Sequence, residues 1–149
     1  MTTRQLHPAD ALLAQSVVSQ FHERGVSVSY SEKFLANPAN YLLIAEENGE
    51  VIGFLSAHQL DSIERESAAM FIYEIEVEKA HHRKGAGRAL IDHIRTIALE
   101  RGMFEMFVFT NRSNTSACAF YQSTGGQIEE GDELMFVYYL PDAQRQPEK

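Results

Sequence analysis

Hydrophobic residues recur with the spacing of a helix at the start of the chain. Leu13, Val17 and Phe21 lie four residues apart, which places them on one face of a helix. The pattern predicts a helix over residues 8–24, and Gly25 supplies a residue suited to end it. An amphipathic helix of this kind buries its apolar face against another layer of the protein.

Two short apolar runs follow, over residues 41–45 and 51–55, and both are predicted to be strands. Asn48-Gly49 lies between them and is a strong signal for a tight β-hairpin. Ahead of this pair, Ser31 is expected to cap a short helix that runs to Leu35. The first half of the chain therefore predicts helices followed by an antiparallel pair of strands.

The second half of the chain alternates between the hydrophobic patterns of strands and helices. Strands are predicted over 70–77 and 104–109, and a helix with a single apolar stripe over 88–101 joins them. A strand, a helix and a strand in this order predict a parallel crossover. A helix over 114–123 and a last strand over 134–140 complete the pattern. The predicted fold is mixed α/β, with one central mixed sheet flanked by helices.

Composition narrows the class of protein. With 149 residues and 44% hydrophobic content, the chain suits a single domain over 1–140, with a polar tail over 141–149. Thirteen Lys plus Arg against 21 Asp plus Glu give a net charge of −8, which disfavours nucleic-acid binding. The single cysteine, Cys118, allows no intrachain disulfide. No apolar run approaches the ~20 residues of a membrane span, and no signal peptide is recognised, so a cytoplasmic enzyme is expected.

The loop after the third predicted strand carries the first chemical signal. His82-Arg83-Lys84-Gly85-Ala86-Gly87-Arg88 places two glycines and three basic residues between a strand and a helix. Glycine lets the backbone approach a ligand closely, and the first turn of a helix offers unpaired N–H groups to a pyrophosphate. The loop matches neither a Walker motif nor the dinucleotide fingerprint. The alternative is a plain glycine turn with solvated basic residues.

A second motif follows the next predicted strand. Asn114-Thr115-Ser116-Ala117-Cys118-Ala119-Phe120-Tyr121 is succeeded by Gly125. Together, the two motifs resemble the GNAT superfamily of acyl-CoA-dependent N-acetyltransferases. That family carries Gln/Arg-x-x-Gly-x-Gly/Ala and then Asn-x-x-Ala-x-x-Phe-Tyr in this order. The resemblance covers residues 42–140, and His82 stands where the family usually has Gln or Arg.

The resemblance implies a single GNAT-like domain that uses acetyl-CoA as co-substrate and no metal. It implies cofactor contacts along the third strand, in the glycine loop and at the second motif: Ile75, Glu76, Val77, His82, Arg83, Lys84, Gly85, Ala86, Gly87, Arg88, Asn114 and Tyr121. Tyr121 is the implied general acid. Glu74 is the first candidate for the base that deprotonates the amine, and Glu76 is the second. The structural alternatives are a packing tyrosine, solvated glutamates and, at Asn114, a helix N-cap.

Within the superfamily, the chain is most similar to the aminoglycoside 3-N-acetyltransferases. Phe71-Ile72-Tyr73-Glu74-Ile75-Glu76-Val77 resembles their Tyr-Ile-Tyr-Asp-Leu-Ala-Val, and His81-His82-Arg83-Lys84-Gly85 resembles their His-Arg-Arg-Gln-Gly. Met135-Phe136-Val137-Tyr138 departs from their Met-His-Phe-Asp. The implied acceptor is a small cationic amine, best an aminoglycoside, which implies antibiotic resistance. Alternatives are a protein or peptide amine, or a non-catalytic acyl-CoA-binding module. The acidic stretch Glu129-Glu130-Gly131-Asp132-Glu133 is an acceptor site or a solvated loop, and the aromatic C-terminal strand favours a homodimer.

Overall fold

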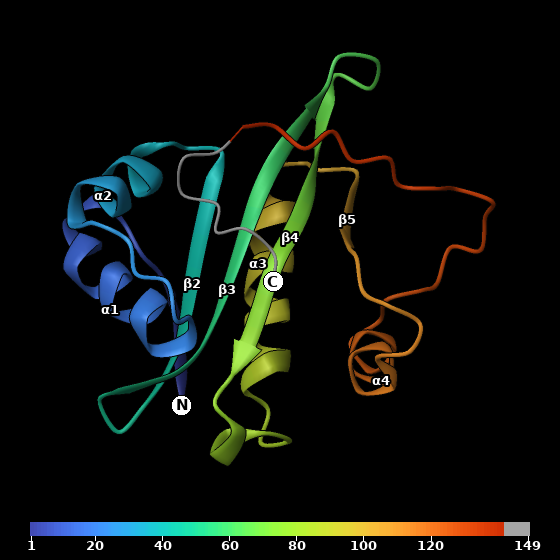
Figure 1. Cartoon of the computed structure of the whole chain (residues 1–149). Helices are drawn as coiled ribbons and strands as arrows, with labels where there is room; N and C mark the ends of the chain where they lie inside the picture. Colours follow the sequence, from blue (N-terminus) through green and yellow to red (C-terminus); the bar gives the residue numbers. More distant parts are fainter. Residues whose placement is uncertain (142–149) are drawn as a thin grey trace.

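A five-stranded sheet forms the centre of the protein in the computed structural model, which describes residues 1–141 (Figure 1). The strands follow the order β1-β2-β3-β4-β5 across the sheet, and every neighbouring pair is antiparallel except the parallel pair β4–β5. Their bounds are β1 Thr2–Gln5, β2 Asn40–Glu47, β3 Glu50–Ser62, β4 Ser67–Val77 and β5 Glu105–Val108. The α/β fold with one mixed sheet is confirmed.

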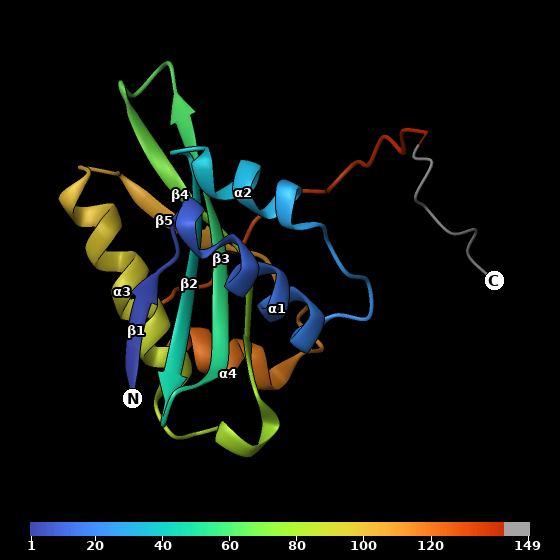
Figure 2. The same cartoon turned by 90° about the vertical axis from the view of Figure 1, so that its left-hand side faces the viewer.

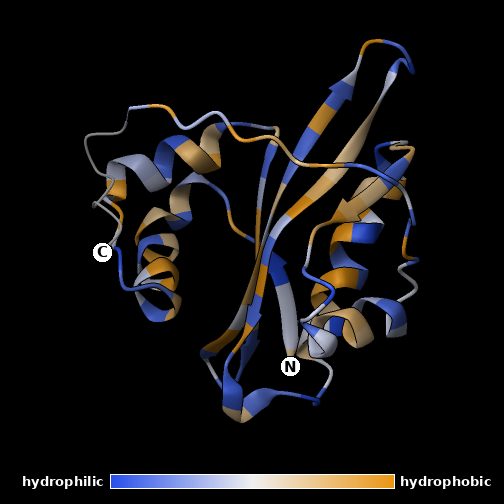
Figure 3. Ribbon diagram, turned by 45° about the vertical axis from the view of Figure 1, so that its right-hand side comes forward, coloured by the Kyte–Doolittle hydropathy of each residue, from blue (hydrophilic) through white to orange (hydrophobic). Residues whose placement is uncertain are grey.

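Helices cover both faces of this sheet (Figure 2). On one face lies α3 (Ala86–Glu100), whose buried stripe packs on β2, β3 and β4. On the other face, α1 (Ala11–Phe21) and α2 (Val28–Ala36) enclose a second core with β2 and β3. Short 3₁₀ turns, η1 (Pro8–Asp10) and η2 (Lys79–His81), precede α1 and follow β4, and α4 (Thr115–Ser123) follows β5. In Figure 3 the loop after β4 is mainly hydrophilic.

A bulge in β4 interrupts its regular pairing with β3. The register pairs Ser56 with Glu74 and Ala57 with Ile72, so Tyr73 is an extra residue on β4. Strand pairing between β4 and β5 ends at Ile72, although β4 continues to Val77. A bulge bends its strand and re-aims side chains, and it is common beside active sites. The two parallel strands therefore separate beyond the bulge, as Figure 1 shows.

The predicted hairpin turn is confirmed, whereas the predicted cap of the second helix is wrong and one strand was missed. The Asn48-Gly49 turn has positive φ at both residues (51° and 80°) and joins β2 to β3 in a two-residue hairpin. Ser31 does not cap α2. Ser27 does, because its Oγ accepts a hydrogen bond from the Tyr30 N–H at 3.1 Å, whereas Ser31 is buried. The prediction missed β1, a four-residue strand at the start of the chain whose residues alternate between exposed and half-buried.

The last predicted strand is wrong. Residues 134–140 form no helix or strand, and their large side chains are 50–87% exposed. A strand needs a hydrogen-bonded partner, and the apolar run in the sequence specifies none. The polar tail over 141–149 lies outside the described residues except for Pro141.

Within residues 1–141, no helix combines the length and the apolar character needed to cross a membrane.

Candidate active site

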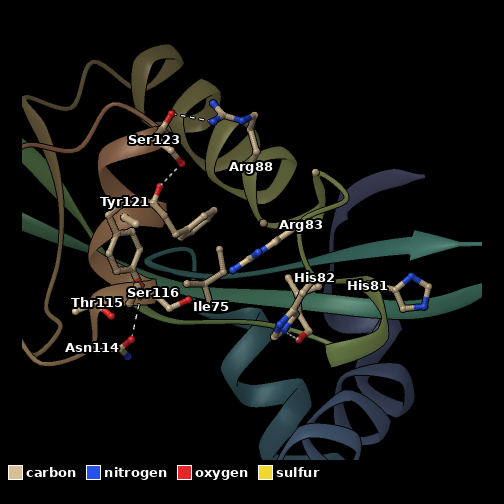
Figure 4. Close-up of a pocket in the computed structure, with 16 residues that line it drawn as sticks. Ile75, His81, His82, Arg83, Arg88, Asn114, Thr115, Ser116, Tyr121 and Ser123 are labelled. Atoms are coloured by element: carbon tan, nitrogen blue, oxygen red, sulfur yellow. Dashed lines mark hydrogen bonds between the residues drawn. The ribbon is translucent and has the colours of Figure 1, made fainter.

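A cleft of about 860 Å³ opens where β4 leaves β5 (Figure 4). It lies between the end of β4, the loop before α3, and α4. Its walls are Ile75, Val77, His81, His82, Arg83, Gly85, Gly87, Arg88, Asn114, Thr115, Ser116, Ala117, Ala119, Phe120, Tyr121 and Ser123. Since no described strand pairs with β4 beyond Ile72 on this side, backbone polar groups of the strand are left for a ligand.

The loop before α3 has the backbone of an anion site. Gly85 occupies the N-cap with φ of 92°, a left-handed conformation that glycine adopts without strain. No side chain caps the helix, so no capping group pairs with the N–H groups of its first turn. These N–H groups and the helix dipole attract a phosphate. The loop therefore suits a pyrophosphate without needing a particular side chain at position 82.

His82 serves this loop in a different way from a phosphate ligand. Its Nε2–H donates to the carbonyl oxygen of Val77 at 2.7 Å, which ties the loop back to the end of β4. Arg83 and Arg88 contribute positive charge to the cleft. The Arg88 guanidinium also donates to the Ser123 carbonyl at 2.8 Å and so links α3 to α4. The departure from the family's Gln or Arg thus keeps the loop geometry and leaves the charge to the arginines.

The first turn of α4 closes the opposite wall. Asn114 caps this helix, because its Oδ1 accepts a hydrogen bond from the Ala117 N–H at 3.1 Å. A side chain on Gly87 would meet ring carbons of Phe120 at 3.0 Å, so glycine permits the close approach of α3 and α4. Tyr121 is half-buried, and burial raises the pKa of its hydroxyl above the ordinary value of 10.0. Its hydroxyl therefore stays protonated through the neutral range, as a proton donor requires.

A second cleft of about 340 Å³ lies on the other side of β4, beneath α1 and α2. Apolar and aromatic side chains form most of its lining, with a few polar ones: Ala14, Val17, Val18, His22, Val26, Tyr30, Ser31, Phe34, Leu42, Phe54, Ser56, His58, Tyr73 and Glu74. The bulge places Tyr73 and Glu74 at this cleft, whereas Ile75 lines the first one. The β4 backbone is thus the partition between the two clefts.

Glu74 has a fixed partner in the second cleft. His22 Nε2 lies 3.1 Å from Glu74 Oε1, and each side chain is about one-third exposed (33% and 34%). His22 caps the end of α1 through its backbone N–H, and its ring meets Phe54 edge to face at 5.9 Å. Ligand atoms of His22, Glu74 and Glu76 all lie within 4.8 Å of one another. No metal is expected from the sequence, and no local motif links these three residues.

The structure brings most of the predicted site residues together. Tyr121 and eight further predicted cofactor residues line the first cleft: Ile75, Val77, His82, Arg83, Gly85, Gly87, Arg88 and Asn114. Three predicted cofactor residues do not line it: Glu76 and Lys84, which are exposed, and Ala86, which is buried in the core beneath α3. The acidic residues over 129–133 are exposed and line neither cleft.

Sequence reasoning missed most of the second cleft. His22, Ser56 and Tyr30 come from three elements that no local motif connects. Glu74, the first candidate for the base, and Tyr73 lie in the predicted strand over 70–77 and also line this cleft. The strand alternation of β3 is a signal that places Phe54, Ser56 and His58 on one face.

Comparisons with known proteins agree with this architecture. The profile described as the acetyltransferase (GNAT) family matches residues 10–125. The uncharacterized N-acetyltransferase YhfO of Bacillus subtilis (strain 168) is 27% identical over 146 residues, covering 93% of this chain and 95% of its own length. A crystal structure of an aminoglycoside acetyltransferase from an uncultured soil metagenomic sample is 28% identical, with a TM-score of 0.79 and coverage of 91% and 97%. A second such acetyltransferase, in complex with sisomicin, is 23% identical, with a TM-score of 0.81 and coverage of 94% and 96%.

Proposed function

Because the chain belongs to the acetyltransferase (GNAT) family, we propose that its first cleft binds acetyl-CoA and its second cleft binds the amine that accepts the acetyl group. The chain is an acetyl-CoA-dependent N-acetyltransferase, as members of this family are. The observation that carries the assignment of the two clefts is the separation of β4 from β5 beyond Ile72, with one cleft on either side of β4. Two reactants held on opposite sides of one strand meet at its backbone.

In this proposal the pyrophosphate of acetyl-CoA sits on the first turn of α3, with Arg83 and Arg88 beside it. The pantetheine arm runs along β4 from Val77 toward Tyr73, where the absence of pairing with β5 leaves backbone groups available. A strand N–H polarises the thioester carbonyl and stabilises the oxyanion of the tetrahedral intermediate. Holding both substrates together supplies much of the rate by proximity and orientation.

The proton transfers follow from the side chains on either side of β4. Glu74, with His22, takes one proton from the ammonium of the acceptor, and the resulting amine attacks the thioester carbon. The carbon–nitrogen bond forms and the carbon–sulfur bond breaks. Tyr121 protonates the departing thiolate and is itself reprotonated, through solvent, by the second proton that the nitrogen loses. The products are the acetamide, CoA and one proton released to solvent.

For the acceptor we propose an aminoglycoside, acetylated at its 3-amino group. Support comes from the 28% identical aminoglycoside acetyltransferase and from a net charge of −8, which favours a cationic substrate. Glu74 supplies negative charge in the second cleft, and a carboxylate oxygen of Glu76 lies within 4.8 Å of it, outside the lining. A homodimer and a cytoplasmic location remain predictions from the sequence.

A panel of amines tests this function. CoA release from acetyl-CoA is followed by thiol detection with several aminoglycosides, polyamines, amino acids and a lysine peptide. We expect turnover with aminoglycosides and mass-spectrometric evidence of a single added acetyl group at the 3-amino position. Turnover with another amine alone overturns the aminoglycoside proposal and keeps the enzyme. No turnover with any amine, despite acetyl-CoA binding, favours a non-catalytic acyl-CoA-binding module.

If Tyr121 is the general acid, its replacement should lower turnover without weakening acetyl-CoA binding. We expect Tyr121→Phe to lower kcat by roughly 10- to 100-fold, below the usual range for a general acid, because a CoA thiolate leaves moderately well unaided. The Kd of acetyl-CoA changes little, since the ring that lines the cleft remains. Steady-state kinetics and isothermal titration calorimetry measure the two quantities. Tyr41→Phe is the matched control, because Tyr41 lies in the core beneath α3, away from both clefts. A Tyr121→Phe variant with unchanged kcat would exclude the acid role.

A further inference from the structure

Two polar residues of β3 face the second cleft and have no part in the proton transfers described above. Ser56 and His58 lie two residues apart on one strand face, and both line the cleft. Ser56 pairs directly with Glu74 in the register of β3 and β4. Its side chain is more than nine-tenths buried (8% exposed), and its Oγ has no hydrogen-bond partner among the described residues. A buried hydroxyl without a partner is costly, unless a ligand satisfies it.

A chain of hydrogen bonds determines which nitrogen of His58 carries the proton. The Asn40 Nδ2 donates to the Phe34 carbonyl oxygen at 3.1 Å, which fixes the orientation of the amide. Asn40 Oδ1 therefore faces His58 Nδ1, at 2.9 Å, and it can only accept a hydrogen bond. His58 must carry its proton on Nδ1. In the neutral ring, Nε2 is then left with a free lone pair.

The surroundings of His58 keep this ring neutral and in place. Burial lowers its pKa below the ordinary value of 6.5, so the neutral form dominates at pH 7. Phe34 and Tyr73 meet the ring edge to face, at 5.9 Å and 5.8 Å between centroids. These two aromatic contacts restrict the movement of the ring. His58 thus presents a hydrogen-bond acceptor, not a charge, to the cleft.

We infer that Ser56 Oγ and His58 Nε2 form a recognition row for the acceptor, contacting a polar group other than the amine that reacts. The inference rests on the proposed function, because the second cleft must be the acceptor site. Glu74 lies opposite Ser56, so the reacting ammonium sits at that end of the row, and His58 is two strand residues away, about 7 Å. The favoured acceptor is an amine with a second N–H or O–H donor at that separation, such as an amino sugar. A simple monoamine leaves Nε2 unpaired and binds less well.

The test of Ser56 separates recognition from structure. In Ser56→Ala we expect KM for sisomicin to rise roughly 2- to 12-fold, the size of one neutral hydrogen bond. The melting temperature stays the same or rises, because the variant removes a buried hydroxyl that lacks a partner. Ser62→Ala, at the far end of β3 and outside both clefts, is the matched control. A lower melting temperature with unchanged KM would show a structural role and overturn this part of the inference.

The test of His58 uses its two nitrogens. Asparagine at this position replaces Nδ1 with an amide N–H and provides nothing at Nε2, so His58→Asn keeps the donor to Asn40 and loses the acceptor. We expect KM for sisomicin to rise by about tenfold or more, with a smaller change in kcat. His93→Asn, on α3 outside both clefts, is the matched control. An unchanged KM in His58→Asn overturns the inference.

Asn40→Asp adds a further measurement, the pH dependence of KM, which would not change if His58 had only a structural role. A carboxylate against Nδ1 favours the imidazolium, so the pH below which KM rises shifts upward relative to the parent protein. The other titratable groups facing this cleft are His22 at the C-cap of α1, Tyr30 from α2, and Tyr73 and Glu74 from β4, and they are the same in both proteins. Nitrogen-15 NMR of the imidazole reports the tautomer directly, without any substrate. A proton on Nε2 in the free protein overturns the inference.

The inference can be tested even if the proposed function fails, because the NMR measurement of the His58 tautomer needs no substrate. Should sisomicin fail while another amine reacts, KM is measured with that amine, and the same ratios are expected provided it carries a second donor. Should no amine react, the proposed function fails, and sisomicin titrated into the CoA-loaded protein by calorimetry decides the inference. Binding that His58→Asn weakens supports the row, and no binding overturns it.

Discussion

Replacement of Glu74 with glutamine is expected to lower kcat/KM for the amine by about 10²- to 10⁴-fold at pH 7, the range typical for loss of a general base. Glutamine has nearly the shape of glutamate, and its Oε1 can stay where Glu74 Oε1 lies in the parent protein, 3.1 Å from His22 Nε2. The geometry of the second cleft is therefore kept. What disappears is the basic oxygen that receives the proton of the ammonium.

The loss is expected to shrink as the pH rises. A primary ammonium of the lysine type has a pKa near 10, so at pH 7 almost all of the amine is protonated and needs a base. As the pH approaches that value, the neutral amine arrives already deprotonated and Glu74 has less to contribute. The ratio of parent to Glu74→Gln activity should therefore fall between pH 7 and pH 9.5, measured with a fixed saturating concentration of acetyl-CoA.

Two further variants identify which carboxylate acts. Glu76→Gln is expected to cause a smaller loss than Glu74→Gln, because Glu76 is exposed and lines neither cleft. Glu105→Gln, on β5 and outside both clefts, serves as the unchanged control. A deficit in Glu74→Gln that is the same at every pH, or one matched by weaker acetyl-CoA binding, would contradict the role of Glu74 as base.

The sequence predicted the first cleft far better than the second. The glycine loop and the stretch Asn114–Tyr121 are local motifs, and a helix N-terminus after a glycine forms the same backbone site wherever it occurs. The second cleft joins His22, Ser56 and Glu74 from three elements, and only the packing of α1 on the sheet brings them together. Glu74 was predicted through resemblance. Its partner His22 had no signal in the local sequence.

The bulge at Tyr73 and the C-terminal segment show the same limit in the fold. Alternation along β4 predicts a strand, but it does not say where one extra residue shifts the register and turns both Tyr73 and Glu74 toward one cleft. The apolar run over 134–140 has strand propensity and no partner strand among residues 1–141. Propensity and periodicity are properties of a segment, whereas pairing is a property of two segments.

The apolar stripe of α3 was predicted correctly and gives the largest expected effect on stability. Leu90 has no exposed surface and lies in the core cluster formed by α3 with β2, β3 and β4. We expect Leu90→Ala to lower the free energy of unfolding by about 2–5 kcal/mol, because the variant loses buried methyl groups and leaves a cavity that the neighbours fill only in part. A domain of ordinary stability has about 5–15 kcal/mol in total, so the loss is a large fraction of it.

Leu99 of the same helix is the matched control, because the substitution is chemically identical and the side chain is 71% exposed. We expect Leu99→Ala to change the free energy of unfolding by no more than about 0.5 kcal/mol. Urea denaturation followed by circular dichroism measures both variants, with equal m-values if the unfolded states are alike. In thermal melts, each kcal/mol lost lowers Tm by about 2–4 °C for a chain of this size. Since α3 begins at the loop assigned to the pyrophosphate, saturating acetyl-CoA should recover part of the lost Tm in Leu90→Ala, as a ligand that binds only the folded state does. Equal losses in the two variants would mean that α3 does not bury the face that carries Leu90.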